Sequence, residues 1–155
     1  DTLIGDGDAN TINGNAGDDI MNGRAGDDRL TGGLGSDTLT GDLGSDRFVY
    51  NSVAEGGDTI TDFSAVSGNN DTFFFARTAF TGDGLVQPAG LVLTSNFITR
   101  ASDHLAQDGN DFFIYQTDTH QLWYDPTGSD ILGDETLIAT VQAGATVIRT
   151  DIFLF

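Results

Sequence analysis

Residues 14–31 read Gly14-Asn-Ala-Gly-Asp-Asp-Ile-Met-Asn22 and then Gly23-Arg-Ala-Gly-Asp-Asp-Arg-Leu-Thr31, which are two consecutive copies of one nine-residue pattern. The pattern is G-x-x-G-x-D-x-U-x, where U is a large apolar residue. It occurs five times in register, in residues 5–13, 14–22, 23–31, 32–40 and 41–49. Residues 1–4 read as the tail of an earlier unit, so we expect the sequence to be a fragment of a longer protein.

Three positions of the pattern carry its chemistry. Glycine can adopt turn conformations that leave main-chain carbonyls uncovered; it fills the first position (Gly5, Gly14, Gly23, Gly32, Gly41) and, in four units, the fourth (Gly17, Gly26, Gly35, Gly44). The sixth position is Asp1, Asn10, Asp19, Asp28, Asp37 and Asp46, and the eighth is Leu3, Ile12, Met21, Leu30, Leu39 and Phe48. One polar ligand-type side chain and one core-type side chain therefore recur in every unit.

Each unit has room for a tight turn and a strand of about three residues. Two units then make one lap of a flattened parallel coil, with turns on both edges. Stacked strands lie about 4.8 Å apart, so we expect Asp19 over Asp37 on one edge and Asp28 over Asp46 on the other. Bare carboxylates at that spacing repel by roughly 3 to 4 kcal/mol per pair at an effective dielectric near 20. The stacking therefore predicts divalent cations between the turns.

Calcium is the cation that best suits these units. It takes several oxygen ligands and accepts carboxylates together with main-chain carbonyls, whereas magnesium demands tighter octahedral geometry. Zinc prefers Cys or His, and the repeats contain neither. The eighth-position side chains bury too little apolar surface to offset the entropy lost on ordering the turns. We expect the coil to be disordered without calcium and ordered with several bound Ca²⁺ ions.

The units resemble the nonapeptides of the RTX (repeats-in-toxin) family, a calcium-binding parallel β-helix repeat. This resemblance implies a parallel β-roll, with calcium held between successive laps by sixth-position side chains and main-chain oxygens of the glycine turns. The implied ligands are Asp1, Asn10, Asp19, Asp28, Asp37 and Asp46, with oxygens of Gly14, Gly17, Gly23, Gly26, Gly32, Gly35, Gly41 and Gly44. Asn10 and Asp8 depart from the pattern, which sets the first full unit apart.

The segment after the repeats resembles the exit from the roll in RTX proteins, including the C-terminal domain of serralysin metalloproteases. The residues that carry this likeness are Asp46-Arg-Phe-Val-Tyr50 and Gly57-Asp-Thr-Ile-Thr-Asp-Phe63. By analogy Asp58 completes the last calcium site with a repeat aspartate, or it only caps a turn.

Composition and the absence of certain motifs exclude several classes of function. The net charge is −18, there is no lysine, and 22 of the 24 acidic residues are aspartate, so nucleic acid is not an expected partner. The absence of cysteine excludes thiol catalysis and thiolate metal sites. No apolar run is long enough for a membrane span. Neither H-E-x-x-H nor G-x-S-x-G occurs, and we expect no enzyme in this chain.

Residues 50–155 differ in composition from the repeats at 1–49. We expect a parallel β-roll at 1–49 and, continuous with it, a C-terminal β capping and secretion region at 50–155. All but one of the phenylalanines lie in the second segment, which predicts a separate core. Short apolar stretches between turn residues predict strands at 59–63, 72–75, 91–94, 112–116, 121–124, 136–141 and 152–155. A short helix at 99–107 stays open. The expected fold is all-β, a parallel β-roll followed by a mainly antiparallel, sandwich-like cap.

We predict a module that folds on binding extracellular Ca²⁺ and serves as the C-terminal folding and type I secretion module of a larger protein. The final Asp151-Ile-Phe-Leu-Phe155 resembles the end of type I secretion substrates, and it also reads as a final strand. The protein would be secreted or bound to the bacterial cell surface, with the secretion machinery as a partner. The alternative is a glycan- or surface-binding module of an adhesin or polysaccharide-modifying enzyme. Trp123, Tyr115 and Tyr124 would then stack on sugar rings, or they are core residues.

Overall fold

The computed structural model describes residues 1–81, 90–91, 97–101, 112–127 and 133–155. Regular structure in this part of the chain is β apart from two 3₁₀ turns, η1 (Val53–Glu55) and η3 (Arg149–Asp151). The strands are β1 (Thr2–Ile4), β2 (Thr11–Ala16), β3 (Ile20–Asn22), β4 (Arg29–Leu34), β5 (Thr38–Thr40), β6 (Arg47–Tyr50), β7 (Asp58–Ile60), β8 (Ala65–Val66), β9 (Asn69–Asn70), β10 (Thr72–Phe75), β11 (Gly90–Leu91), β12 (Phe97–Arg100), β13 (Phe113–Gln116), β14 (Gln121–Tyr124), β15 (Thr136–Val141) and β16 (Ile152–Leu154).

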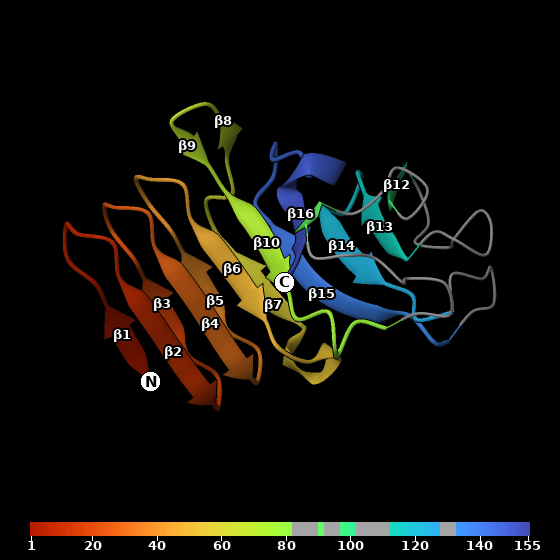
Figure 1. The fold of residues 1–155 in the computed structure, drawn as a ribbon, viewed down its shortest axis with the longest axis horizontal. Helices are drawn as coiled ribbons and strands as arrows, with labels where there is room; N and C mark the ends of the chain where they lie inside the picture. The colour runs from red at the N-terminus through yellow and green to blue at the C-terminus, as the bar shows by residue number, and fades with distance from the viewer. Residues whose placement is uncertain (82–89, 92–96, 102–111, 128–132) are drawn as a thin grey trace.

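The repeats form a parallel β-roll, as predicted. Successive strands alternate between two facing sheets, so β1, β3 and β5 pair in one sheet and β2, β4 and β6 in the other. Eighth-position residues lie in register: Met21 pairs with Leu39, and Leu30 pairs with Phe48. The laps follow one another from the N-terminal end of the molecule in Figure 1.

Both sheets of the roll continue into the C-terminal region. One has eight strands in the order β1-β3-β5-β7-β15-β14-β13-β12, and the other has six in the order β11-β16-β10-β6-β4-β2. The cap contains both kinds of pairing. Pairs β8–β9, β11–β16, β13–β14 and β14–β15 are antiparallel, as expected, but β7–β15, β10–β16 and β12–β13 are parallel. The reason is that β15 and β16 extend parallel sheets whose strand direction the repeats had already set.

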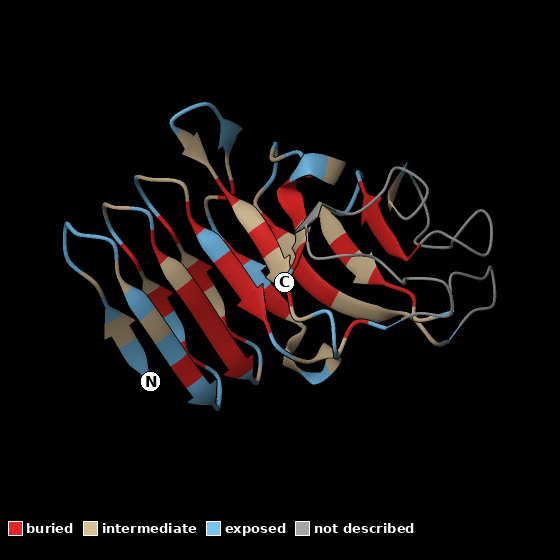
Figure 2. Cartoon of the chain, in the orientation of Figure 1, coloured by how far each residue is buried: buried red, intermediate tan, exposed pale blue. Residues whose placement is uncertain are grey.

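One hydrophobic core runs through the roll and the cap, so the separate core expected for residues 50–155 is wrong. The buried cluster extends from Met21 through Phe48 and Phe73 to Leu154. Figure 2 shows buried stretches on strands of both the repeats and the cap. The expected boundary after residue 49 also falls inside β6. Aromatic rings of the second segment pack directly on the eighth-position ladder, with the Phe48 and Phe73 centroids 6.2 Å apart.

Most strands predicted after the repeats are present. The hairpin β13–β14 and strands β10 and β15 match closely, and β16 matches all but the last residue. Of the predicted strand at 91–94, Leu91 lies in β11 and the rest lies outside the described residues. Thr99 and Arg100 belong to β12 rather than to a helix, and residues 102–107 lie outside the described part. Among the described residues no helix is long and apolar enough to cross a membrane.

Candidate metal centre

The turns between strands stack along the two edges of the roll. Sixth-position residues stand at the start of each strand. On one edge these are Asp1, Asp19 and Asp37, followed by Asp58, and on the other Asn10, Asp28 and Asp46, followed by Asp71. The strand registers place each residue over the next one along its edge. The structure thus brings the predicted carboxylates together in two ladders.

One oxygen of each stacked carboxylate is occupied by the main chain of the preceding lap. The N–H of Asp19 donates to Oδ1 of Asp37 at 2.8 Å, 18 residues later. The same contact joins the N–H of Asp28 to Asp46 at 2.8 Å and the N–H of Asn10 to Asp28 at 2.7 Å. These hydrogen bonds hold neighbouring laps in register. They also explain why a short side chain with two acceptors recurs at this position.

The other oxygen has no such partner. Oδ2 is buried and without a hydrogen bond, within the described residues, in four repeat aspartates: Asp19, Asp28, Asp37 and Asp46. Each of these residues is at most 2% exposed. A buried carboxylate oxygen left unsatisfied is costly unless a cation or donor reaches it. The four orphaned oxygens therefore fit a hard cation.

Main-chain oxygens of the glycine turns lie beside these carboxylates. A Cβ atom placed on Gly14 would lie 2.5 Å from Oδ2 of Asp19 and 2.5 Å from the carbonyl oxygen of Gly32, one lap later. These two oxygens therefore converge on one small space between successive turns. First-position glycine is required here because any side chain would fill that space.

Fourth-position glycines allow the laps to approach closely. Gly26 has a φ of +114°, and a Cβ on it would lie 2.8 Å from the carbonyl oxygen of Asp8 in the previous turn on that edge. Gly17, Gly35 and Gly44 share the positive φ. Both the conformation and the close approach exclude larger residues.

The first full unit differs from the others, as its sequence indicated. Oδ1 of Asn10 accepts the N–H of Asp6 within its own turn, at 2.8 Å. Neither Asp6 nor Asp8 has the positive φ found at the second and fourth positions of later units. Asp1 stands at the open end of the roll, with its side chain 89% exposed. Asp1 is thus open to solvent. Oδ1 of Asn10 lies beside Gly5 and the carbonyl oxygen of Gly23, as the repeat carboxylates lie beside their glycines, but it already accepts the N–H of Asp6.

Burial perturbs the acidity of the stacked aspartates. It raises the pKa of Asp46 to about 6 and the pKa values of Asp58 and Asp71 to about 7, with neighbouring carboxylates raising them further. It also raises the pKa values of Asp28 and Asp37. Loss of water is the largest cause in every case. A cation bound beside these carboxylates would offset the cost of burying their charge, which is the cause of the raised pKa values.

Asp71 was missed in the sequence because it lies 25 residues after Asp46 instead of 18. A signal was present: Asp71-Thr-Phe73 and Asp58-Thr-Ile60 both repeat the D-x-U core of the nonapeptide. Asp58 and Asp71 take the next places in the two ladders, where they accept the N–H groups of Asp37 and Asp46 at 3.0 Å. The ladders therefore extend beyond the glycine pattern.

The donor set indicates the kind of ion. Within the described part of the chain, no three His, Cys, Asp or Glu side chains converge well enough to hold a metal by themselves. An ion here would need main-chain carbonyls beside carboxylates, a mixture that calcium accepts.

Comparisons with known proteins agree with this geometry. Residues 1–30 and 23–52 match the model of a family described as the RTX calcium-binding nonapeptide repeat, in four copies. The fold is similar to the solution structure of the AlgE6R3 subunit from the Azotobacter vinelandii mannuronan C5-epimerase. That match has a TM-score of 0.59 and 21% sequence identity, and covers 98% of this chain and 78% of the other. No curated protein sequence matches the chain.

The family match covers the laps that carry the orphaned carboxylate oxygens and their glycine turns. The structural match shows the same kind of β-roll fold. Residues 1–52 therefore carry repeats of the RTX calcium-binding nonapeptide type.

Proposed function

We propose that this chain folds on binding extracellular Ca²⁺ and serves as the C-terminal folding and type I secretion module of a larger secreted bacterial protein. The observation that carries the proposal is the set of four buried Oδ2 atoms without hydrogen-bond partners in the described structure, in Asp19, Asp28, Asp37 and Asp46. Their placement beside main-chain oxygens suits a hard cation between successive turns. The ligands would be these atoms together with carbonyl oxygens such as that of Gly32.

The energetics support a calcium-driven switch. Sites tuned to extracellular calcium bind at about 0.1 to 1 mM. At ten times the dissociation constant, each independent site contributes about 1.4 kcal/mol, so four sites contribute roughly 6 kcal/mol. A chain held unfolded by carboxylate repulsion would therefore stay unfolded where calcium is scarce. It would fold once it reaches a calcium-rich medium.

Circular dichroism of the full chain during a calcium titration tests this proposal. We expect β structure to appear with calcium and to disappear with chelator. The double variant Asp28→Ala, Asp37→Ala should lose the transition, whereas Asp118→Ala, which removes a carboxylate from an exposed hairpin turn, should keep it. A chain equally folded and equally heat-resistant in excess chelator would contradict the proposal.

The export role has its own test. The full chain would be expressed in cells that carry a type I secretion apparatus, with and without residues 152–155. Appearance of the full chain alone in the medium supports export through this end. Equal export of both forms shows that the final residues act only as the strand β16.

A second candidate function, polysaccharide binding, is favoured by the outer face of the six-stranded sheet. Arg29 and Arg47 are neighbours across β4 and β6. Their guanidinium groups lie 5.7 Å from the Phe155 ring and 5.3 Å from the Phe74 ring. Neither forms an ion pair with a described residue, despite the net charge of −18. Cations beside aromatic rings suit an anionic sugar.

The structure excludes two of the three residues that the sequence suggested for stacking on sugar rings. Tyr115 and Tyr124 are each 1% exposed, so they are core residues and cannot stack on a glycan. A hollow of about 390 Å³ lies instead beside Arg47, Thr72, Phe74 and Phe153. Because the similar solved structure belongs to a mannuronan epimerase, mannuronan is the first ligand to test. Binding that is retained in Arg47→Ala would exclude this surface.

A further inference from the structure

Two asparagines of the repeats are followed directly by glycine: Asn13 by Gly14, and Asn22 by Gly23. Each asparagine fills the ninth position of its unit, so the glycine is the first residue of the next unit. The structure fixes that glycine, because a Cβ on Gly23 would collide with Oδ2 of Asp28. Every other asparagine of the chain precedes a residue that carries a side chain. The two Asn-Gly pairs therefore differ in reactivity from the rest.

An Asn-Gly pair can react with itself. The main-chain nitrogen of the glycine attacks Cγ of the asparagine, a C–N bond forms, and the Cγ–Nδ2 bond breaks. Ammonia leaves with the proton of the glycine N–H, and a cyclic succinimide remains. Water then opens one of its two carbonyls, which gives aspartate or isoaspartate, whose main chain runs through the former side-chain carbon. Glycine favours this ring closure because it has no Cβ to hinder the turn.

The folded roll holds the peptide group between Asn22 and Gly23 on both sides. Its carbonyl oxygen accepts the N–H of Gly5 at 2.8 Å, and its N–H donates to the carbonyl oxygen of Thr40 at 2.9 Å. Strand β3 accordingly lies between β1 and β5. To reach Cγ of Asn22, the nitrogen of Gly23 has to rotate away from Thr40, and both hydrogen bonds break. The fold therefore opposes the first step of the reaction.

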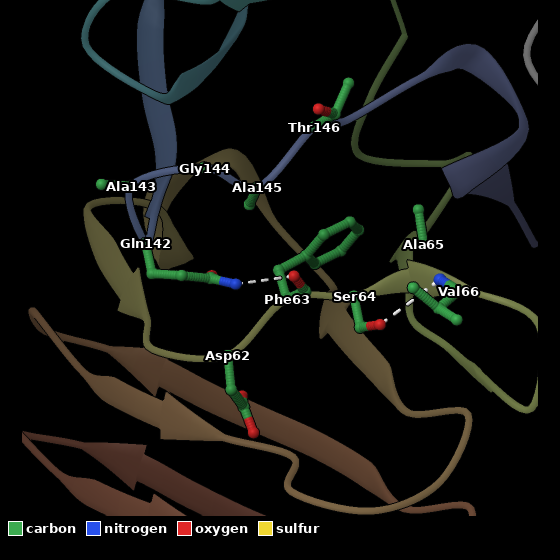
Figure 3. Close-up of a pocket in the computed structure, with 10 residues that line it drawn as sticks. All are labelled: Asp62, Phe63, Ser64, Ala65, Val66, Gln142, Ala143, Gly144, Ala145 and Thr146. Carbon is green, nitrogen blue, oxygen red and sulfur yellow. Dashed lines mark hydrogen bonds between the residues drawn. The ribbon is translucent and has the colours of Figure 1, made fainter.

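The acceptor of this N–H is itself anchored through the next strand to the cap. Oγ1 of Thr40 lies 2.7 Å from Oγ1 of Thr61. Asp62 accepts the N–H that follows Thr40, at 3.0 Å. Figure 3 shows Asp62 directed toward the strands of the roll, with Gln142 reaching the main chain of Phe63 by a 2.8 Å hydrogen bond. Release of the nitrogen therefore requires β3 to separate from a strand that is fixed on its far side.

The pair Asn13–Gly14 has the same chemistry in a less protected place. Strand β2 ends the six-stranded sheet, so it has a neighbour on one side only within the described structure. Asn13 is exposed, whereas Asn22 is half-buried. Segments with fewer contacts open locally at a lower cost in free energy. The two pairs thus form a matched comparison within one chain.

We propose that Asn22–Gly23 is a deamidation site that folding protects, and that its isoaspartate product cannot return to the roll. Isoaspartate adds a carbon to the main chain between Met21, which is fully buried in the core, and Gly23, which packs against Asp28. Both neighbours are fixed by stacking, so the added length has no place to go. A chain that stays unfolded therefore loses with time its ability to fold. This inference does not rest on calcium, because any condition that unfolds the chain exposes the site.

Peptide mapping by tandem mass spectrometry tests the protection. The full chain would be aged in calcium at mildly alkaline pH, with and without urea. Reaction through a transiently opened segment follows the population of the open form, so we expect conversion at Asn22 to be at least about tenfold slower without urea. Conversion at Asn13 should be slowed less, and the two sites should react alike in urea. Equal conversion of Asn22 in both media would overturn the proposal.

Two variants serve as controls for the mapping. Asn22→Thr places at the ninth position the residue found there in the next two units, Thr31 and Thr40. It should fold like the unaltered chain and show no conversion at residue 22. Asn22→Asp carries the charge of one product on an ordinary main chain, and it should also fold. Failure of Asn22→Asp to fold would assign the damage to the charge and overturn the role of isoaspartate.

Refolding after ageing tests the consequence. We expect chains aged in urea to regain less β structure by circular dichroism, in proportion to their isoaspartate at residue 22. The double variant Asn13→Thr, Asn22→Thr should regain all of it. Full refolding of chains that carry isoaspartate at residue 22 would contradict the proposal. A fresh chain that is folded in chelator would instead contradict the proposed calcium-dependent folding, and the comparison in urea would still stand.

Discussion

The main-chain N–H of Asp28 donates a 2.8 Å hydrogen bond to Oδ1 of Asp46, which stands one lap later on the same edge. This contact brings two buried carboxylates close together and leaves Oδ2 of each without a partner among the described residues. A single geometric relationship therefore sets the register of the roll and creates its need for cations.

The first-position glycines should be as necessary as the aspartates. A Cβ on Gly32 would collide with Oδ2 of Asp37, whereas a Cβ on Gly7 would meet nothing within 4 Å. We expect Gly32→Ala to destabilise the calcium-loaded chain by about 1 to 3 kcal/mol and Gly7→Ala to change it little. Thermal unfolding in calcium measures both. Equal stability of the two variants would show that the space beside Asp37 is not used.

The pH dependence should reverse between chelator and calcium. The folded-state pKa values of Asp46, Asp58 and Asp71 are raised to about 6, 7 and 7, above the ordinary value of 3.8. The folded chain then binds more protons than the unfolded one, so in chelator its stability rises as the pH falls from about 7 toward 4. In calcium, protons compete with the ion, and stability falls over the same range. Circular dichroism at both conditions checks the signs.

The eighth-position ladder should account for the apolar part of the stability of the roll. Met21 is fully buried, and its neighbour Ile20 is 57% exposed. Met21→Ala should cost about 2 to 5 kcal/mol, and Ile20→Ala should lie within about 0.5 kcal/mol of the unaltered chain. Unfolding by urea in saturating calcium measures the difference. Similar losses of stability from both variants would show that the side chain of Met21 contributes no more to the core than that of Ile20.

Removal of residues 152–155 should expose the edge of β10. Strand β16 lies between β10 and β11, and Phe153 stacks on Phe74 with centroids 4.9 Å apart. We expect the shortened chain to melt at lower temperature in calcium and to self-associate through the freed edge. Light scattering and thermal unfolding report the two effects. Phe155→Ala, which leaves the strand in place, serves as the control.

The sequence was informative wherever its period was strict. Leu30 and Phe48 are predicted to face the core, and Asp28 and Asp46 to stack, because each pair is separated by two whole units. Counting failed where the spacing changed, so Asp58 was named only from the family resemblance and Asp71 was missed. The steps from Asp37 to Asp58 and from Asp46 to Asp71 contain insertions. Counting in units of nine residues therefore no longer predicts which residues stack, although hydrogen bonds still join each pair.

The cap was harder to predict because its pairing is long-range. Strand β15 joins β7, and β16 joins β10, across many intervening residues. Local patterns located the hairpin β13–β14, whose partners are adjacent in the chain. They gave no information on which free edge the last strands would fill, and so the mixed sheets and the shared core were not foreseen.

The position of β16 inside the six-stranded sheet has a consequence for the order of events as the protein folds. Among the described strands, β16 pairs with β10 on the side opposite β6, so that edge of β10 stays open until residues 152–154 reach it. The parallel laps before β10 can pair with their neighbours first. Completion of the sheet is therefore tied to the meeting of two strands that lie far apart in the sequence.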